Sequence, residues 1–183
     1  IGDDTTSQQS APGDPQYVAL PIGRTAISLT DVDYAGACAI LDNGSAMCWG
    51  SGDDYQLGNG EINDAFSPVY VNLPAGKTAT AISGSGTRCA ILDDGSVVCW
   101  GDNWYGQLGN GLSISDHGVY NSSSPLEVTL PPGRTAISIS VFWNHACAIL
   151  DDGAAMCWGN DEWGQIGNGV TNISNIDGTY ATD

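Results

Sequence analysis

An eleven-residue segment with a cysteine at each end occurs three times in this chain. It reads CAILDNGSAMC at 38–48, CAILDDGSVVC at 89–99 and CAILDDGAAMC at 147–157. The first cysteines stand at positions 38, 89 and 147, and intervals of this length are typical of the units of solenoids and propellers. We therefore expect a single repeat domain over residues 1–183.

Each copy lies inside a longer unit that keeps the same order of blocks. A segment between two prolines, followed by Gly, a basic residue and Thr, precedes the first cysteine of each copy. A Trp-Gly pair follows the second cysteine and opens the blocks WGSGDDYQLGNG, WGDNWYGQLGNG and WGNDEWGQIGNG. The predicted units cover about 15–60, 68–111 and 125–169, and residues 1–14 and 170–183 are predicted to be connecting segments.

The apolar runs in each unit indicate strands rather than helices. They are short, rich in Val, Ile, Ala, Thr and Tyr, and bounded by Gly, Pro, Asn and Asp. No segment has a convincing helical period. Because each unit contains four such runs, the sequence predicts an all-β fold of three four-stranded antiparallel repeats.

The cysteine-bounded segments are predicted to be hairpins. Asn43-Gly44, Asp94-Gly95 and Asp152-Gly153 supply residues that tolerate positive φ in a tight turn. The two cysteines of each copy are equidistant from that turn, so they fall opposite each other with Cβ atoms about 4.5–5.5 Å apart, near disulfide distance. The favoured pairing is Cys38–Cys48, Cys89–Cys99 and Cys147–Cys157. The alternative is six reduced core cysteines in a cytosolic protein, and the spacing does not resemble that of structural zinc ligands.

The predicted disulfides place the protein outside the cytosol, in an extracellular or cell-surface location. Three Asn-x-Ser sequons, at Asn43, Asn121 and Asn172, agree weakly with this and make it a possible glycoprotein. The chain begins with Ile1 and has no apolar leader, so we expect that a signal was removed or that this is a piece of a longer protein.

The chain is strongly acidic, with 21 Asp and Glu, four Lys and Arg, and a formal net charge of −17. Nucleic acids and anionic lipids are therefore poor partners, since binding them needs a basic surface. No apolar run approaches the roughly 20 residues that cross a bilayer, so membrane insertion is not expected. Solubility is the favoured explanation of the acidity, and cation binding is the alternative.

No catalytic or metal-binding constellation is visible in the sequence. The two histidines are His117, in a polar connection, and His145, in a predicted strand, where packing is the favoured role. Paired carboxylates such as Asp93-Asp94 stand mostly at turns, where Asp bonds to nearby backbone. None follows the ligand spacing of a calcium loop, so calcium is supported by residue type alone. We predict a protein that is not an enzyme and has no cofactor.

The tryptophans divide into two groups. Trp49, Trp100 and Trp158 recur at one register after the second cysteine, which predicts packing between repeats. Other aromatic residues near polar turns do not repeat uniformly, and these are the candidates for a rim that recognises a protein or a glycan: Trp104, Tyr105, Trp143 and Trp163.

These blocks together resemble the repeat of the regulator of chromosome condensation family, in the cysteine-containing form common in secreted and surface proteins of microbes. The resemblance rests on the Cys-Ala-Ile-Leu-Asp-Asp-Gly hairpin, Cys-Trp-Gly and the Asn-x-x-Gly-Gln-Leu-Gly-Asn-Gly block. It implies a β-propeller with one four-stranded blade per repeat, usually seven in a ring. The founding member is a nuclear exchange factor that binds chromatin and a small GTPase, an activity at odds with this chain's acidity. Tyr55 departs from the pattern, because Gly106 and Gly164 precede Gln in the other copies.

Three blades leave two blade faces bare, more apolar surface than a soluble monomer usually exposes. The chain is therefore expected to be a homo-oligomer or a fragment of a longer propeller. The favoured function is a non-enzymatic extracellular interaction module whose variable connections (60–68, 111–125 and 169–183) bind a protein or glycan. The alternative is a structural subunit that assembles through its open blade faces into a filament or surface layer. Part of a propeller enzyme is a remote alternative.

Overall fold

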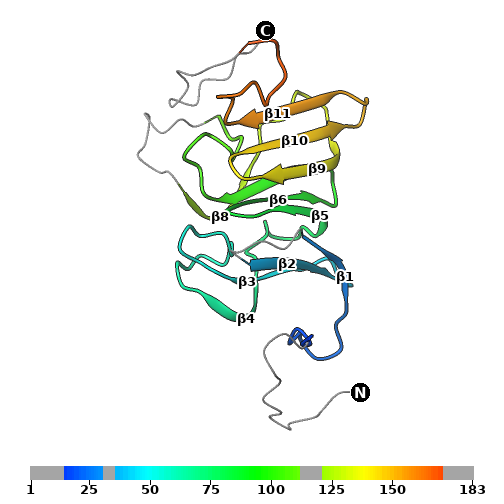
Figure 1. Ribbon diagram of the computed structural model, residues 1–183. Coiled ribbons are helices and arrows are strands. Elements are labelled where there is room, and N and C mark those ends of the chain that lie inside the picture. The colour runs from blue at the N-terminus through cyan, green and yellow to red at the C-terminus, as the bar shows by residue number, and fades with distance from the viewer. Residues whose placement is uncertain (1–14, 31–35, 112–120, 171–183) are drawn as a thin grey trace.

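The computed structural model describes residues 15–30, 36–111 and 121–170 of the chain (Figure 1). Within these ranges the chain forms eleven β-strands and no helix. The strands are β1 (Ala26–Leu29), β2 (Gly36–Leu41), β3 (Ala46–Gly50), β4 (Ala65–Tyr70), β5 (Ala79–Gly84), β6 (Thr87–Leu92), β7 (Val97–Gly101), β8 (Ser122–Glu127), β9 (Ala136–Phe142), β10 (His145–Leu150) and β11 (Ala155–Gly159).

The strands form three antiparallel sheets that are stacked one on another, with the first at the bottom of Figure 1 and the third at the top. The strand orders are β1-β2-β3-β4, β5-β6-β7-β8 and β9-β10-β11, so neighbours in sequence are neighbours in each sheet. The predicted all-β class is confirmed. Among the described residues, the third sheet has three strands.

The sheets are offset from the predicted units. Pro68 and Pro125 were expected to open the second and third units, but they lie in β4 and β8, which pair with the strands of the preceding sheet. Cys48 in β3 faces Val69, and Cys99 in β7 faces Leu126. The predicted limits differ from the sheets because a repeating sequence gives the length of a unit but not the residue at which the unit begins. The hydrogen bonds between strands determine where each sheet begins and ends.

The three cysteine-bounded segments form hairpins in the same register, and all three predicted disulfides are present. Cys38 faces Cys48, Cys89 faces Cys99 and Cys147 faces Cys157. Gly44, Gly95 and Gly153 have φ of 77°, 79° and 85°, and the preceding side-chain oxygen accepts a bond from the backbone N–H two residues on. The predicted role of these residues as turn formers is confirmed.

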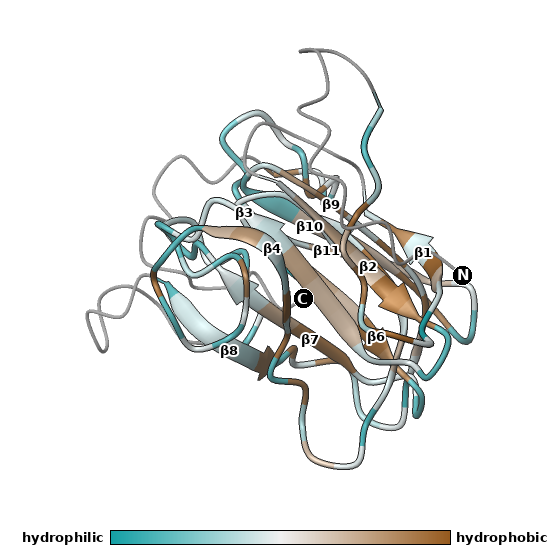
Figure 2. Cartoon of the chain, turned by 90° about the horizontal axis from the view of Figure 1, so that it is seen from below, coloured by the Kyte–Doolittle hydropathy of each residue, from teal (hydrophilic) through white to brown (hydrophobic). Residues whose placement is uncertain are grey.

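Two apolar cores lie between the stacked sheets. The first contains Cys38, Ile40 and Cys48 on one side and Ala90 and Trp100 on the other. The second joins the opposite face of the middle sheet to the third sheet through the residues Cys89, Ile91, Cys99, Ala146, Ala148 and Trp158. The middle sheet is therefore buried on both faces, and Figure 2 shows hydrophobic residues along β2, β6 and β7 with hydrophilic residues in the loops at their ends. Each fully buried aliphatic side chain contributes about 1.5–3 kcal/mol.

The antiparallel order gives the stack two different ends. We call one the hairpin end, because it carries the turns at 42–45, 93–96 and 151–154. We call the other the loop end. It carries the connections that follow β3, β7 and β11, together with the turns at 85–86 and 143–144.

Candidate functional site

A glutamine two residues before each Gly-Asn-Gly stabilises a loop at the loop end through side-chain hydrogen bonds. The side-chain Oε1 of Gln107 accepts a hydrogen bond from the backbone N–H of Tyr105 (2.6 Å), and its Nε2 donates to Asp102 Oδ2 (3.0 Å). Equivalent bonds link Gln56 to Asp54 and Ser51, and Gln165 to Trp163 and Asn160. Each loop tip is therefore held by a side chain that begins inside the same loop.

The backbone of the same glutamine binds the next sheet. Trp100 Nε1 donates to the carbonyl oxygen of Gln56 (3.0 Å), and Trp158 Nε1 donates to that of Gln107 (2.9 Å). Both indoles are fully buried. The predicted packing of Trp100 and Trp158 between repeats is thus confirmed, but nothing in the local sequence pattern indicated that glutamine would be the acceptor.

A glycine two residues after each glutamine leaves room for the indole. A Cβ atom at Gly58 would lie 2.6 Å from Trp100 Nε1, and one at Gly109 would lie 2.7 Å from Trp158 Nε1. Both glycines also have left-handed φ, 64° and 65°. Glycine is therefore required at these positions for both space and backbone conformation.

One basic side chain, Arg88, is fully buried between the first and second sheets. Its Nη1 donates to the Gln56 carbonyl oxygen (2.8 Å), which also accepts the bond from Trp100. Arg88 faces Trp100 across the β6–β7 pair, and Ala146 holds the matching position opposite Trp158 in the third sheet. The guanidinium is therefore part of the contact between the first and second sheets, and the contact between the second and third sheets has an alanine at the same position.

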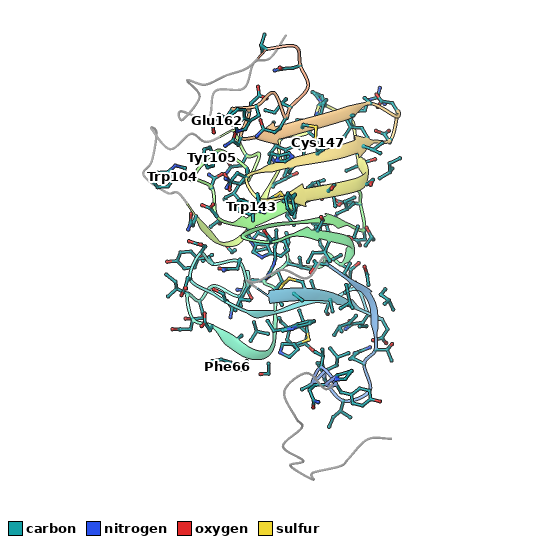
Figure 3. The ribbon with its side chains drawn as sticks, viewed as in Figure 1. Phe66, Trp104, Tyr105, Trp143, Cys147 and Glu162 are labelled. Carbon is teal, nitrogen blue, oxygen red and sulfur yellow. A yellow bond between two sulfur atoms is a disulfide. The ribbon has the colours of Figure 1, made fainter. Side chains whose placement is uncertain are left out.

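The predicted rim residues all lie at the loop end, and Figure 3 labels three of them, Trp104, Tyr105 and Trp143. Trp104 and Tyr105 follow β7, Trp163 follows β11, and Trp143 occupies the β9–β10 turn. The three tryptophans are exposed, and Tyr105 is partly buried. Phe142, which the sequence did not single out, is also exposed, and its ring centroid lies 6.2 Å from that of Trp143. The role of these residues in recognition stays a prediction.

Trp143 has an uncommon backbone conformation. Its φ is 54°, in the left-handed region that bulky residues rarely adopt. This conformation costs about 1–2 kcal/mol for a residue with a Cβ atom. The turn therefore holds an exposed indole at its tip despite a local energetic cost.

The basic residues that are exposed among those described lie at the hairpin end and are paired there. Arg24 binds Asp42 (3.3 Å), Lys77 binds Asp94 (2.5 Å), and Arg134 binds Asp151 and Asp152 (3.6 and 3.0 Å). The hydrogen bond from Lys77, helped by Ser96, holds the pKa of Asp94 well below its usual range, and the backbone N–H of Thr25 lowers that of Asp42. Exposed pairs of this kind add little stability.

The loop end, by contrast, carries acidic residues and, in the described part of the chain, no exposed Lys or Arg. The acidic residues are Asp53, Asp54, Glu61, Asp64, Asp102, Asp161 and Glu162. Burial raises the pKa of Asp102, and the neighbouring Asp54 charge adds to this. The loop end is therefore an acidic surface from which aromatic side chains project.

Asn121 joins two of the loops. Its Nδ2 donates to Asp54 Oδ1 (3.0 Å), and its Oδ1 accepts from the Asn103 backbone N–H (3.3 Å). The nitrogen that a sugar would modify is thus already bonded to a side chain from the first repeat. Glycosylation of Asn43 and Asn121 stays a prediction, and Asn172 lies outside the described residues.

The described residues contain no group of three or more His, Cys, Asp or Glu that could hold a metal ion. Nor does this part of the chain contain a helix long and apolar enough to span a bilayer. A groove of about 570 Å³ at the hairpin end is lined by Asp94, Ser96 and residues 127–135, and two of its ionic groups, Asp94 and Arg134, are in ion pairs. His145 is half-buried at the start of β10, and His117 lies outside the described residues.

Comparison with known proteins gives a consistent family match. The model described as regulator of chromosome condensation (RCC1) repeat matches residues 43–92 and 94–149, and a second model with this description matches 136–165. Human E3 ubiquitin-protein ligase HERC2 is 27% identical over 175 residues, which cover 94% of this chain and 3% of HERC2. The Arabidopsis thaliana ultraviolet-B receptor UVR8 is 30% identical over 138 residues, which cover 74% of this chain and 30% of UVR8.

Solved structures show the same fold. Yeast RCC1 (Prp20) bound to Kap60 matches with a TM-score of 0.66 and 22% identity, covering 78% of this chain and 31% of that one. Prp20p from Saccharomyces cerevisiae, studied for its binding to Gsp1p and histones, matches with a TM-score of 0.65 and 19% identity, covering 83% and 37%. The predicted β-propeller fold is confirmed, and the sheets are its blades. The chain spans well under half the length of these relatives.

Proposed function

We propose, from the premise that this chain belongs to the regulator of chromosome condensation (RCC1) repeat family, that it is an extracellular interaction scaffold whose partner binds at the loop end. The observation that carries this proposal is the separation of charge. The exposed bases of the described residues are paired at the hairpin end, whereas the loop end combines acidic residues with exposed tryptophans. Aromatic residues are enriched at the centres of protein interfaces, and rigid loops present them at low entropic cost.

The chemistry of this surface favours a basic protein segment as the partner. A Lys or Arg side chain that lies over an indole and near a carboxylate gains from both groups. The acidic loop end would also attract such a segment from a distance, an effect that falls as salt rises. Binding of Prp20p to histones, which are basic proteins, is in line with this choice.

The extracellular location is supported by the three disulfides. Their cysteines account for all six in the chain. Disulfides persist in oxidising compartments and are rare in the cytosol.

Peptide binding tests the proposal. Isothermal titration with an arginine- and lysine-rich peptide should give saturable binding that weakens with salt, and neutral or acidic peptides should not bind. The double variant Trp104→Ala, Trp163→Ala should weaken binding at least tenfold, while Tyr17→Ala, an exposed aromatic away from this surface, should not. Equal binding by all three proteins would contradict the proposal, and binding of a neutral oligosaccharide at the same residues would favour the glycan alternative.

A second candidate function is assembly into a filament or surface layer. It is favoured by apolar side chains that are exposed on the two outer blades, including Leu29 on the first blade and Ile149 on the third. Where two blades meet, the equivalent residues Ile82, Ile40 and Ile91 are buried. Sedimentation of the chain over a range of concentrations tests this function, and a monomer throughout would contradict it.

A further inference from the structure

We infer that Trp143 is a binding residue for the basic partner segment, with a Lys or Arg side chain of that segment lying on its indole ring. This inference rests on the proposed function and names one of the contacts that would carry it. It follows from a turn that holds a bulky, exposed residue in a strained conformation that the fold itself does not need.

Trp143 lies in the turn between β9 and β10 with a φ of 54°. Among the described residues that have a Cβ atom, Tyr55 is the other one with a positive φ, at 60°. The left-handed region is unfavourable for such residues, and a bulky side chain is rarely found there. Strain of this kind persists only where the surrounding structure maintains it, and strained residues cluster at functional sites.

The indole of Trp143 gains little from the rest of the chain. Trp143 is 62% exposed, and within the described residues its ring contact is with Phe142, which is 65% exposed. By contrast, the indoles of Trp100 and Trp158 are fully buried and donate hydrogen bonds to the preceding blade. Packing inside the chain therefore does not explain why the turn keeps an indole at this position.

The middle blade shows that the equivalent turn needs no aromatic residue. There the turn between β5 and β6 consists of Ser85 and Gly86, and a Cβ atom at Gly86 would meet nothing within 4 Å. Both residues stay partly exposed although the middle blade has a neighbouring blade on each face. An accessible tip is therefore a property of this turn even in a blade that is covered on both sides.

The turn of Trp143 adjoins the loop that follows β11. The backbone N–H of Asn160 donates to the carbonyl oxygen of Asn144 (2.7 Å), so this loop begins against the turn. Glu162, two residues further along the loop, is exposed, and Figure 3 shows it at the same end of the stack as Trp143. A carboxylate thus projects from the loop next to the indole.

The loop that follows β7 meets the same turn at Gly159. A Cβ atom at Gly159 would lie 2.4 Å from the Asn144 carbonyl oxygen and 3.2 Å from the Cβ of Gln107. Gln107 holds the loop that carries Asp102 and Trp104, and Trp104 is 51% exposed although it belongs to the middle blade. Exposed indoles from two neighbouring blades are therefore presented at one junction, together with acidic residues.

A basic side chain is the occupant that this junction favours. In the described part of the chain the loop end carries no exposed Lys or Arg, so its acidic residues lack a counter-charge from the protein there. An ammonium or guanidinium group over an indole is attracted by the ring face and gains further from a nearby carboxylate. An apolar side chain would use the ring but leave the acidic residues without a counter-charge.

Three substitutions of Trp143 separate binding from folding. Trp143→Gly removes the ring and relieves the strain, so its urea midpoint should equal or exceed that of the wild type, while its affinity for an arginine- and lysine-rich peptide should fall about tenfold. Trp143→Leu keeps an apolar side chain without a ring and should lose as much affinity. Trp143→Phe keeps an aromatic face and should bind within about threefold of the wild type.

Tyr55→Gly is the matched control. Tyr55 also combines a positive φ with an aromatic ring, and it lies in a loop at the same end of the stack. The substitution relieves the same kind of strain and removes a ring, but it should change the peptide affinity by less than about twofold. Isothermal titration measures the affinities, and urea denaturation measures the stability of each variant.

The outcomes distinguish this inference from the proposed function. A wild type that does not bind the basic peptide contradicts both. Wild-type binding that Trp143→Gly retains in full contradicts the role of Trp143 alone, and so does an equal loss of affinity in Tyr55→Gly. Full binding by Trp143→Leu would show an apolar contact instead of a cation on the ring. A Trp143→Gly protein that is less stable than the wild type would show that the fold needs the indole.

Discussion

The indole N–H of Trp158 donates a 2.9 Å hydrogen bond to the backbone carbonyl of Gln107, one blade away and 51 residues earlier in the chain. The bond joins the most regular element of the sequence, the Cys-Trp-Gly of each hairpin, to the Gly-Gln-Leu-Gly block of the preceding repeat. The middle blade supplies an indole to the preceding blade and a glutamine carbonyl to the following blade. Both blocks therefore recur in every repeat.

Gly109 beside this bond gives the first prediction. Gly109→Ala should lower the free energy of unfolding by about 1–3 kcal/mol more than Gly167→Ala, because overpacking against the indole adds to the backbone strain. Both positions have left-handed φ, but only at Gly109 would a Cβ atom meet the indole. Urea denaturation measures the difference, and equal losses at the two positions would show that the indole contact does not require glycine.

Tyr55 gives the second prediction. Its φ is 60°, close to the 75° and 76° of Gly106 and Gly164 at the same place in the other loops. Tyr55→Gly should relieve strain and leave the protein as stable or up to about 1 kcal/mol more stable, whereas Gly106→Ala should cost about 1 kcal/mol. Thermal unfolding of both variants checks this, and a marked loss of stability in Tyr55→Gly would mean that its side chain outweighs the strain.

Asp102 gives a prediction about pH. Because burial raises its pKa, folding disfavours the ionised carboxylate, and stability falls as pH rises from the ordinary pKa of 3.8 through the folded-state value. Asp102→Asn should therefore be more stable than the wild type at pH 7, with an advantage that disappears below about pH 3.8. Asn160, at the equivalent position, shows that an asparagine fits this loop.

The control for Asp102 is Asp53→Asn, which makes the same change in net charge at an exposed position of the loop end. Denaturation curves at several pH values should show the pH-dependent gain for Asp102→Asn only. A gain of the same size for Asp53→Asn would assign the effect to the net charge rather than to burial.

The three disulfides should differ in their resistance to reduction. Cys147 and Cys157 are half-buried on the open face of the third blade, whereas the other four cysteines are fully buried between blades. Mild reductant followed by alkylation and mass spectrometry should label Cys147 and Cys157 first. Labelling of Cys89 and Cys99 at the same rate would show that the middle blade opens as readily as the outer one. Each bridge closes a short loop and should contribute about 2–3 kcal/mol.

The hairpins, turns and disulfides were predictable because their signals are local. Each hairpin needs only its own eleven residues, and the threefold repeat removes the ambiguity among cysteine pairings. Three exposed tryptophans near turns, Trp104, Trp143 and Trp163, were also found this way, whereas the exposed Phe142 was not. The β4 and β8 assignments were not, because β4 pairs with β3 only after a loop that runs from residue 51 to residue 64, and local pattern does not say which sheet such a strand joins.

Contacts between repeats were the part that the sequence could not supply. Arg88 carries a charge and stands in a strand, and nothing nearby in the chain indicates that Gln56, 32 residues earlier, receives its hydrogen bond. The separation of charge was hidden for a similar reason. It depends on knowing which turns share an end of the stack, and that follows from strand order rather than composition.

Hydrogen–deuterium exchange of the chain with and without a bound arginine- and lysine-rich peptide shows where on the stack the peptide binds. We expect added protection at the loop end, in residues 102–108, 143–145 and 160–166, and no change in the turns at 42–45, 93–96 and 151–154. Protection confined to those hairpin turns would contradict it.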